Sequence, residues 1–189
     1  VRNTIMGGLA GDALTTGGYN IAIGYSALGT EDTGAKSVAI GYAALGLQNY
    51  NGDAYNIAIG YSTGSEITTG TANTLIGGLT GDALTEGANN VLLGYDAGGS
   101  LTTGSENVAI GSYALKTENV NGFNVAIGYS ALEALDAGDN GYNVAIGYKA
   151  GEAMSTGVNN TIMGGLAGDA LTTGSGSVAL GYNALGSTT

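Results

Sequence analysis

The sequence predicts an all-β protein, a parallel β-solenoid of eleven coils of about 17 residues that forms a single repeat domain over residues 1–189. The first observation is a repeated phrase, N-I-A-I-G-Y-S-A-L at 20–28, which returns as N-V-A-I-G-Y-S-A-L at 124–132. The glycine that closes the phrase recurs in steps of 17 residues, with two steps of 19. These glycines are Gly7, Gly24, Gly41, Gly60, Gly77, Gly94, Gly111, Gly128, Gly147, Gly164 and Gly181.

The second observation is strand-like alternation at the start of each coil, which we number from its leading residue. Position 2 is Val, Ile or Thr, position 3 is mostly Ala, and position 4 is Ile, Leu or Met. This period of two, rich in β-branched residues, predicts a strand. Position 1 is Ser in two coils, at Ser37 and Ser177. In the other nine it is Asn3, Asn20, Asn56, Asn73, Asn90, Asn107, Asn124, Asn143 and Asn160.

The third observation is a turn signal near positions 14 and 15 of most coils. It is a Thr-Gly pair at 16–17, 33–34, 69–70, 103–104, 156–157 and 173–174. A strand, a turn, a second short apolar stretch and another turn make one solenoid coil. Identical positions then stack about 4.8 Å apart, so eleven coils predict a rod on the order of 50 Å long.

Stacking of this kind explains the two most regular columns. An Asn at position 1 is expected to form an amide ladder from coil to coil. The Gly at position 5 is expected to mark a backbone conformation or a close approach that no side chain tolerates.

Positions 9 and 12 show compensation that indicates one shared place in the core. Where position 9 is Leu, at Leu28, Leu45 and Leu115, position 12 is polar: Glu31, Gln48 and Glu118. Where position 9 is Gly, position 12 is aliphatic. Only the eighth coil has Leu at both, Leu132 and Leu135, and it contains a two-residue insertion. Close packing predicts such an exchange.

Both faces of the strand are apolar, because position 3 points away from positions 2 and 4. A small coil has little interior, so burial of both faces indicates that one of them contacts another chain. We expect a homo-oligomer with position 3 or a tyrosine column at its contacts.

The composition excludes several function classes. Fifteen acids against four bases give a net charge of −11, which leaves no basic footprint for nucleic acid or an anionic membrane surface. No apolar run is long enough for a transmembrane helix. Without His or Cys, the usual nucleophile pairs and most metal sites are missing. We expect no enzyme activity and no cofactor, with a paired-carboxylate polysaccharide hydrolase as a remote alternative.

Weak calcium candidates lie in the two 19-residue coils. The segments N-Y-N-G-D at 49–53 and D-A-G-D-N-G at 136–141 carry Asp53, Asp136 and Asp139. Oxygen-rich loops bind extracellular Ca²⁺ weakly, but the same residues are ordinary turn formers. The turn interpretation is therefore favoured.

Two surface columns suggest binding functions. Tyrosine recurs at position 6, and such a column either stacks ring on ring as a structural ladder or offers its rings to sugars. These residues are Tyr25, Tyr42, Tyr61, Tyr95, Tyr129, Tyr148 and Tyr182. Thr-Thr pairs at 15–16, 68–69, 102–103 and 172–173 raise ice binding as an alternative function, although acidic and Asn residues interrupt the columns.

The repeated phrases also carry a resemblance. N-V-A-I-G at 107–111, 124–128 and 143–147, S-V-A-I-G at 37–41 and S-V-A-L-G at 177–181 resemble the head repeats of YadA-like trimeric autotransporter adhesins. The longer phrase N-I-A-I-G-Y-S-A-L resembles repeats of bacterial and phage tail-fibre proteins. The resemblance implies a trimer of left-handed parallel β-rolls, displayed outside a cell or on a virion and used for attachment to a glycan or a host receptor.

The two ends of the segment look alike. The stretch N-T-I-M-G-G-L-A-G-D-A-L-T-T-G occurs at 3–17 and again at 160–174. Neither end shows the polar, atypical repeat that usually caps a solenoid, and open strand edges invite further pairing. We therefore expect a structural, extracellular segment of a longer array, with possible end-to-end association.

Overall fold

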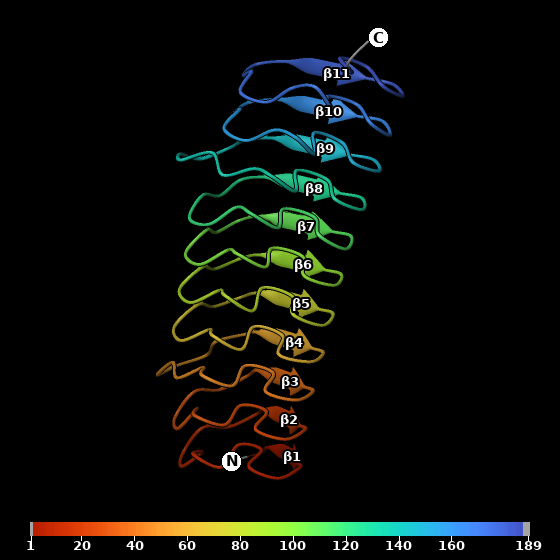
Figure 1. Cartoon of the computed structure of the whole chain (residues 1–189). Helices are drawn as coiled ribbons and strands as arrows, with labels where there is room; N and C mark the ends of the chain where they lie inside the picture. The colour runs from red at the N-terminus through yellow and green to blue at the C-terminus, as the bar shows by residue number, and fades with distance from the viewer. Residues whose placement is uncertain (1, 187–189) are drawn as a thin grey trace.

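The computed structural model describes residues 2–186, which form a β-solenoid of about ten turns with eleven parallel strands in one sheet (Figure 1). Each strand is three residues long and occupies positions 2–4 of its coil. The strands are β1 (Thr4–Met6), β2 (Ile21–Ile23), β3 (Val38–Ile40), β4 (Ile57–Ile59), β5 (Thr74–Ile76), β6 (Val91–Leu93), β7 (Val108–Ile110), β8 (Val125–Ile127), β9 (Val144–Ile146), β10 (Thr161–Met163) and β11 (Val178–Leu180). The predicted solenoid and its period are confirmed. Among the described residues, no helix is long and apolar enough to cross a bilayer.

Strand pairing keeps the same register throughout the sheet. The strands lie side by side in sequence order, and each residue pairs with the residue at the same position of the next coil, as Ala22 does with Ala39. The register survives the longer coils, where Val125 still pairs with Val144. The two extra residues therefore loop outwards. The connections from β3 to β4 and from β8 to β9 project on the same side of the rod (Figure 1).

The interior lies behind position 3, which corrects one expectation from the sequence. Position 3 was expected on the outer, chain-contacting face, but from the second coil onwards its side chains are buried, whereas positions 2 and 4 are partly exposed. In the first coil Ile5 is 46% exposed. The physical reason is the width of the coil. An interior that also holds large aliphatic groups from position 9 or 12 accepts one row of strand side chains, mostly Ala, not two rows. Position 3 residues in the core include Ala22, Ala39, Ala58, Leu75, Leu92, Ala109, Ala126, Ala145 and Ile162.

The compensation between positions 9 and 12 has a steric basis, and position 3 takes part in it. A Cβ added to Gly64 would lie 3.0 Å from Ile67 Cδ1, at position 12 of the same coil, and 2.7 Å from Leu75 Cδ1, at position 3 of the next. Likewise, a Cβ on Gly98 would lie 2.8 Å from Leu92 Cδ1. Glycine at position 9 therefore makes room for two larger neighbours, so three columns share one packed volume.

The glycine at position 5 is required for two reasons. Its φ is 131° at Gly24, in a region that side chains rarely adopt. A Cβ on Gly24 would also lie 2.3 Å from the carbonyl oxygen of Gly41 in the next coil. The backbone thus turns at this column while successive coils are in direct contact.

Three corners of the coils, at positions 7 and 9 and at the last position, use left-handed backbone, and many of the residues there are not glycine, although position 9 is Gly in six coils. In the second coil these are Ser26 (φ 55°), Leu28 (φ 51°) and Lys36 (φ 63°), and the same positions repeat along the rod. A left-handed residue with a Cβ is unfavourable by about 1–2 kcal/mol. Hydrogen bonds between coils hold these corners, such as Leu28 N–H to the Ala44 carbonyl at 3.0 Å.

The Asn column forms a buried ladder of two alternating hydrogen bonds. Asn90 Nδ2 donates to the Gly104 carbonyl of its own coil at 2.9 Å, and its Oδ1 accepts from Asn107 N–H of the next coil at 2.9 Å. Its own N–H donates to Asn73 Oδ1 at 3.0 Å. One side chain therefore closes its own coil and fixes the start of the next.

Replacement of Gly77 by Ala tests the glycine column against an adjacent control. The new Cβ would lie 2.5 Å from the Gly94 carbonyl oxygen at φ 136°, so we expect a loss of about 2–5 kcal/mol in the free energy of unfolding. At Gly78 the Cβ would meet only the Tyr95 ring at 3.7 Å, and Gly78→Ala should stay within about 1 kcal/mol of wild type. Denaturant unfolding followed by circular dichroism measures both, and equal losses would contradict the prediction.

Asn90→Ala tests the amide ladder. It leaves the buried Gly104 carbonyl and the Asn107 N–H without partners, so we expect a loss of about 2–5 kcal/mol. Asn90→Ser should be less harmful, since Ser occupies this position at Ser37 and its hydroxyl keeps one donor and one acceptor. The same unfolding experiment compares the two variants. A Ser variant as unstable as the Ala variant would show that side-chain packing, not hydrogen bonding, decides this position.

Candidate functional site

Two carboxylates lie inside the solenoid without a cationic partner. Glu31, at position 12, is fully buried. The sequence indicated only that a polar residue at position 12 accompanies a Leu at position 9, here Leu28. Glu31 Oε1 accepts from Gly34 N–H at 2.7 Å, and Oε2 accepts from Gln48 Nε2 at 2.9 Å and from Tyr50 N–H at 3.2 Å. Tyr50 belongs to the loop of the first 19-residue coil. The carboxylate therefore anchors an N–H group of the inserted segment.

The same arrangement recurs five coils later around Glu118, which is also fully buried. Its Oε1 accepts from Asn119 N–H at 3.1 Å and from Asn121 Nδ2 at 2.9 Å, and its Oε2 accepts from Ala137 N–H at 3.5 Å. Ala137 lies in the loop of the second 19-residue coil. Burial raises the pKa of Glu118, and these hydrogen bonds oppose the increase in part. We interpret both glutamates as supports for the long loops.

The outer face of the sheet presents partly exposed apolar side chains along the rod. Positions 2 and 4 form two aliphatic columns, with 37% exposure at Ile57 and 38% at Ile76. Aromatic side chains border the columns at position 6 on one side and, in four coils, at the last position of the coil on the other. The last-position aromatics, which the sequence reasoning missed, are Tyr19, Tyr55, Phe123 and Tyr142. The signal for them was their constant place directly before position 1.

Most position-6 tyrosines take part in ring ladders, which Gly78 and Gly165 interrupt. Within residues 2–186, Tyr182 forms no ring contact with another tyrosine. Tyr42 stacks between Tyr25 and Tyr61 with ring centroids 5.6 and 5.2 Å apart, and Tyr129 stacks on Tyr148 at 5.7 Å. Because both faces of Tyr42 are covered by rings, a sugar cannot stack there without displacing one.

In the seventh coil, where position 6 is Ser112, Tyr113 at position 7 fills the gap in the tyrosine column. Its ring meets the neighbouring Tyr95 and Tyr129 rings edge to face, with centroids 5.7 and 5.8 Å apart. The sequence reasoning did not include Tyr113 in the column, because it counted position 6 alone. Edge-to-face contacts of this kind are attractive, so the ladder continues through this coil.

The three weak calcium candidates are not assembled into a metal site. Asp53 accepts from Lys36 Nζ at 2.7 Å and from the Tyr55 hydroxyl at 3.2 Å. The lysine hydrogen bond lowers the pKa of Asp53, while the Asp53 and Tyr55 hydrogen bonds raise that of Lys36. Asp136 and Asp139 are exposed in the other long loop, five coils away. Within residues 2–186 no three His, Cys, Asp or Glu side chains form a group that could hold a metal ion.

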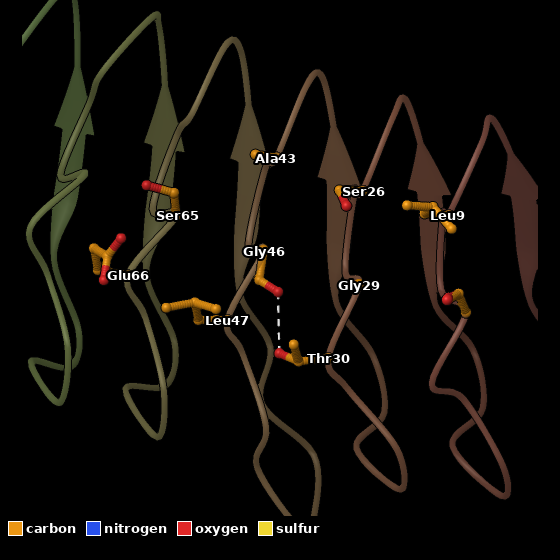
Figure 2. Close-up of a pocket in the computed structure, with 10 residues that line it drawn as sticks. Leu9, Ser26, Gly29, Thr30, Ala43, Gly46, Leu47, Ser65 and Glu66 are labelled. Carbon is orange, nitrogen blue, oxygen red and sulfur yellow. Dashed lines mark hydrogen bonds between the residues drawn. The ribbon is translucent and has the colours of Figure 1, made fainter.

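A groove of about 340 Å³ runs along one side of the first four coils (Figure 2). It is lined by position 7, 10 and 11 residues: Leu9, Asp12, Ser26, Gly29, Thr30, Ala43, Gly46, Leu47, Ser65 and Glu66. Its floor is low because position 10 is Gly in two consecutive coils, at Gly29 and Gly46. The Thr30 hydroxyl donates across this floor to the Gly46 carbonyl at 3.0 Å (Figure 2).

The two ends of the groove are acidic. Asp12 lies at the first coil and Glu66 at the fourth, and both side chains are exposed. Beyond Glu66, Asp82 has a raised pKa, caused first by burial and then by the negative charges of Asp96 and Glu66. The Glu66 end is thus a region of negative potential.

Comparison of the chain with protein-family models, with curated proteins and with solved structures finds no match. Proposals of function therefore rest on two surfaces of the structure itself, the outer sheet face and the groove.

Glu118→Gln tests the buried carboxyl group through the pH dependence of stability. Because burial raises the folded-state pKa above its unfolded value of about 4.3, the folded chain binds this proton more tightly than the unfolded chain. The stabilisation is complete below the unfolded pKa and is lost as the pH rises through the folded pKa. The free energy of unfolding of wild type minus that of Glu118→Gln should therefore fall as the pH rises through the range above about 4.3. Denaturant titrations across this range measure it, and a pH-independent difference would contradict the assignment.

Proposed function

We propose that this chain is a rigid, non-catalytic segment of an extracellular fibre or adhesin that associates laterally with copies of itself. The observation that carries the proposal is the outer sheet face, whose largely aliphatic columns at positions 2 and 4 run the length of the rod, with aromatic residues beside them in most coils. Exposed apolar patches beyond a few hundred Å² usually mark an interaction surface. The interior ladders support the proposed rigidity, because every coil is hydrogen-bonded to the next.

The repeat itself favours a second copy as the partner. Side chains on the outer face recur at the spacing of a β-sheet, about 4.8 Å, and another copy presents the same spacing in the same order. The projecting side chains of one copy can therefore fit between those of the other in every coil along the contact. The resemblance to trimeric adhesin repeats supports three chains, with positions 2 and 4 rather than position 3 at the contacts. An attachment role, with a glycan or surface receptor as partner, rests on the same resemblance.

The ice-binding alternative receives less support. It needs threonine hydroxyls free to meet water in a regular array. The hydroxyls of Thr15, Thr68 and Thr102 instead donate to the carbonyl at the same position of the next coil, at 3.1, 3.3 and 3.2 Å. These hydroxyls serve the solenoid, and we retain the structural role.

Ile76→Lys tests self-association. This position 4 side chain points outwards, so the substitution leaves the interior intact but places a charge on the proposed interface. We expect light scattering to show a wild-type oligomer, most simply a trimer, and a monomer for Ile76→Lys. Ala134→Lys makes the same charge change at an exposed position away from the sheet and should leave the oligomer intact. A monomeric wild type, or equal effects of both variants, would overturn the proposal.

An adhesion assay separates the structural role from catalysis. Binding of the purified protein to glycan arrays and cell surfaces, with no change in the polysaccharides over time, is the expected result. Specific turnover of a polysaccharide would contradict the non-catalytic assignment.

A further inference from the structure

We propose that the groove over the first four coils binds a linear aliphatic polyamine, with its methylene chain on the floor and its ammonium groups at Asp12 and Glu66. This site is additional to the rod function, since it uses positions 7, 10 and 11 and not the outer sheet face. The inference rests on the shape of the groove, its charge, and the contrast with the equivalent surface five coils further along.

The floor of the groove suits a hydrocarbon chain. Gly29, Ala43 and Gly46 offer no side chain beyond a methyl group, and Leu9 and Leu47 add apolar contact along the sides (Figure 2). The hydroxyls of Ser26 and Ser65 also line the groove and can accept from an internal amine. The acidic ends are three coils apart, or about 14 Å at the spacing of stacked strands. A thin, extended ligand with cationic ends matches this arrangement.

The charges at the ends are not neutralised by the chain itself. Its four basic residues are placed elsewhere. Lys36, Lys116 and Lys149 form ion pairs with Asp53, Asp96 and Glu152. Arg2 lies over the Tyr19 ring. With no basic side chain of residues 2–186 paired to Asp12 or Glu66, the attraction is available to an external cation.

The chain contains an internal comparison. Five coils after Gly29 and Gly46, the same backbone positions carry Lys116 and Glu133, and Tyr113 replaces Ser26. There Lys116 pairs with Asp96 at 3.0 Å and lies 4.9 Å from the Tyr113 ring centroid. The buried glutamate and long loop are retained in both halves, whereas the groove is filled in one and open in the other. The open groove is thus not a requirement of the fold.

Titration of the isotope-labelled full chain with spermidine, followed by NMR and calorimetry, tests the proposal. We expect weak, salt-sensitive binding that moves the amide signals of Gly29 and Gly46. Putrescine, which is too short to reach both carboxylates, should bind less tightly. Asp12→Asn and Glu66→Gln should each weaken spermidine binding about two- to fivefold.

Two control variants decide whether the groove is responsible. Gly46→Gln is a neutral isostere of the side chain that the fold accepts at Glu133, so it should fold normally, and it should abolish the Gly29 shift by filling the groove without adding a charge. Glu106→Gln removes an equal charge at an exposed position outside the groove and should leave binding unchanged. If Glu106→Gln weakens binding as much as Glu66→Gln, the attraction is diffuse and the site is refuted.

The remaining outcomes also decide the proposal. Absence of any groove signal change with spermidine would overturn it. Groove-dependent shifts with a neutral oligosaccharide but not with spermidine would assign the groove to sugars instead. Stronger binding of a lysine-rich peptide than of spermidine would make a basic peptide the ligand and would likewise reject the polyamine.

Discussion

Direct contact between identical residues of successive coils is the constraint on which the rest of this structure depends. The position-5 glycines lie so close to the next coil that a single Cβ would overlap its carbonyl oxygen, as at Gly24. That contact is possible only if every coil repeats the same backbone path, including its left-handed corners. The Asn ladder depends on the same repetition, since the Asn90 side chain forms one hydrogen bond within its own coil and another with the next coil.

A coil this narrow divides its side chains by size. The interior takes one row of side chains from the strand, mostly Ala, together with aliphatic groups from positions 9 and 12, so the residues of positions 2 and 4, mostly β-branched, remain outside. The apolar outer face is therefore a consequence of the interior geometry, and it is the surface on which we propose that a second chain packs. Aromatic residues at its borders stack along the rod, which covers part of their own area.

Much of this fold could be predicted from the sequence, because the same residue pattern recurs in every coil. The strand positions, the single sheet and the role of the position-5 glycine follow from repetition alone. The direction of position 3 was predicted wrongly, since alternation with a period of two shows that two faces differ but not which is inside. The small size of Ala22, Ala39 and Ala58 was the signal for the inner face. The burial of Glu31 and Glu118 could not be predicted, because a charged residue at position 12 would usually lie on the surface. Here the glutamate accepts backbone hydrogen bonds in the interior, as Glu31 does. The groove depends on side chains that are absent at Gly29 and Gly46, which a search for functional residues does not detect.

The buried glutamates have a consequence for how such a rod can change. Each one accepts an N–H group from the loop of the next coil, and β3–β4 and β8–β9 still pair in register around the two extra residues. Length variation at this corner is thus decoupled from the spacing of the rungs. A peptide inserted there would be displayed at intervals of five coils, roughly 24 Å, along one side of the rod. The site of the two-residue insertions is therefore suited to grafting, because a peptide can be inserted there without changing the stacked coils.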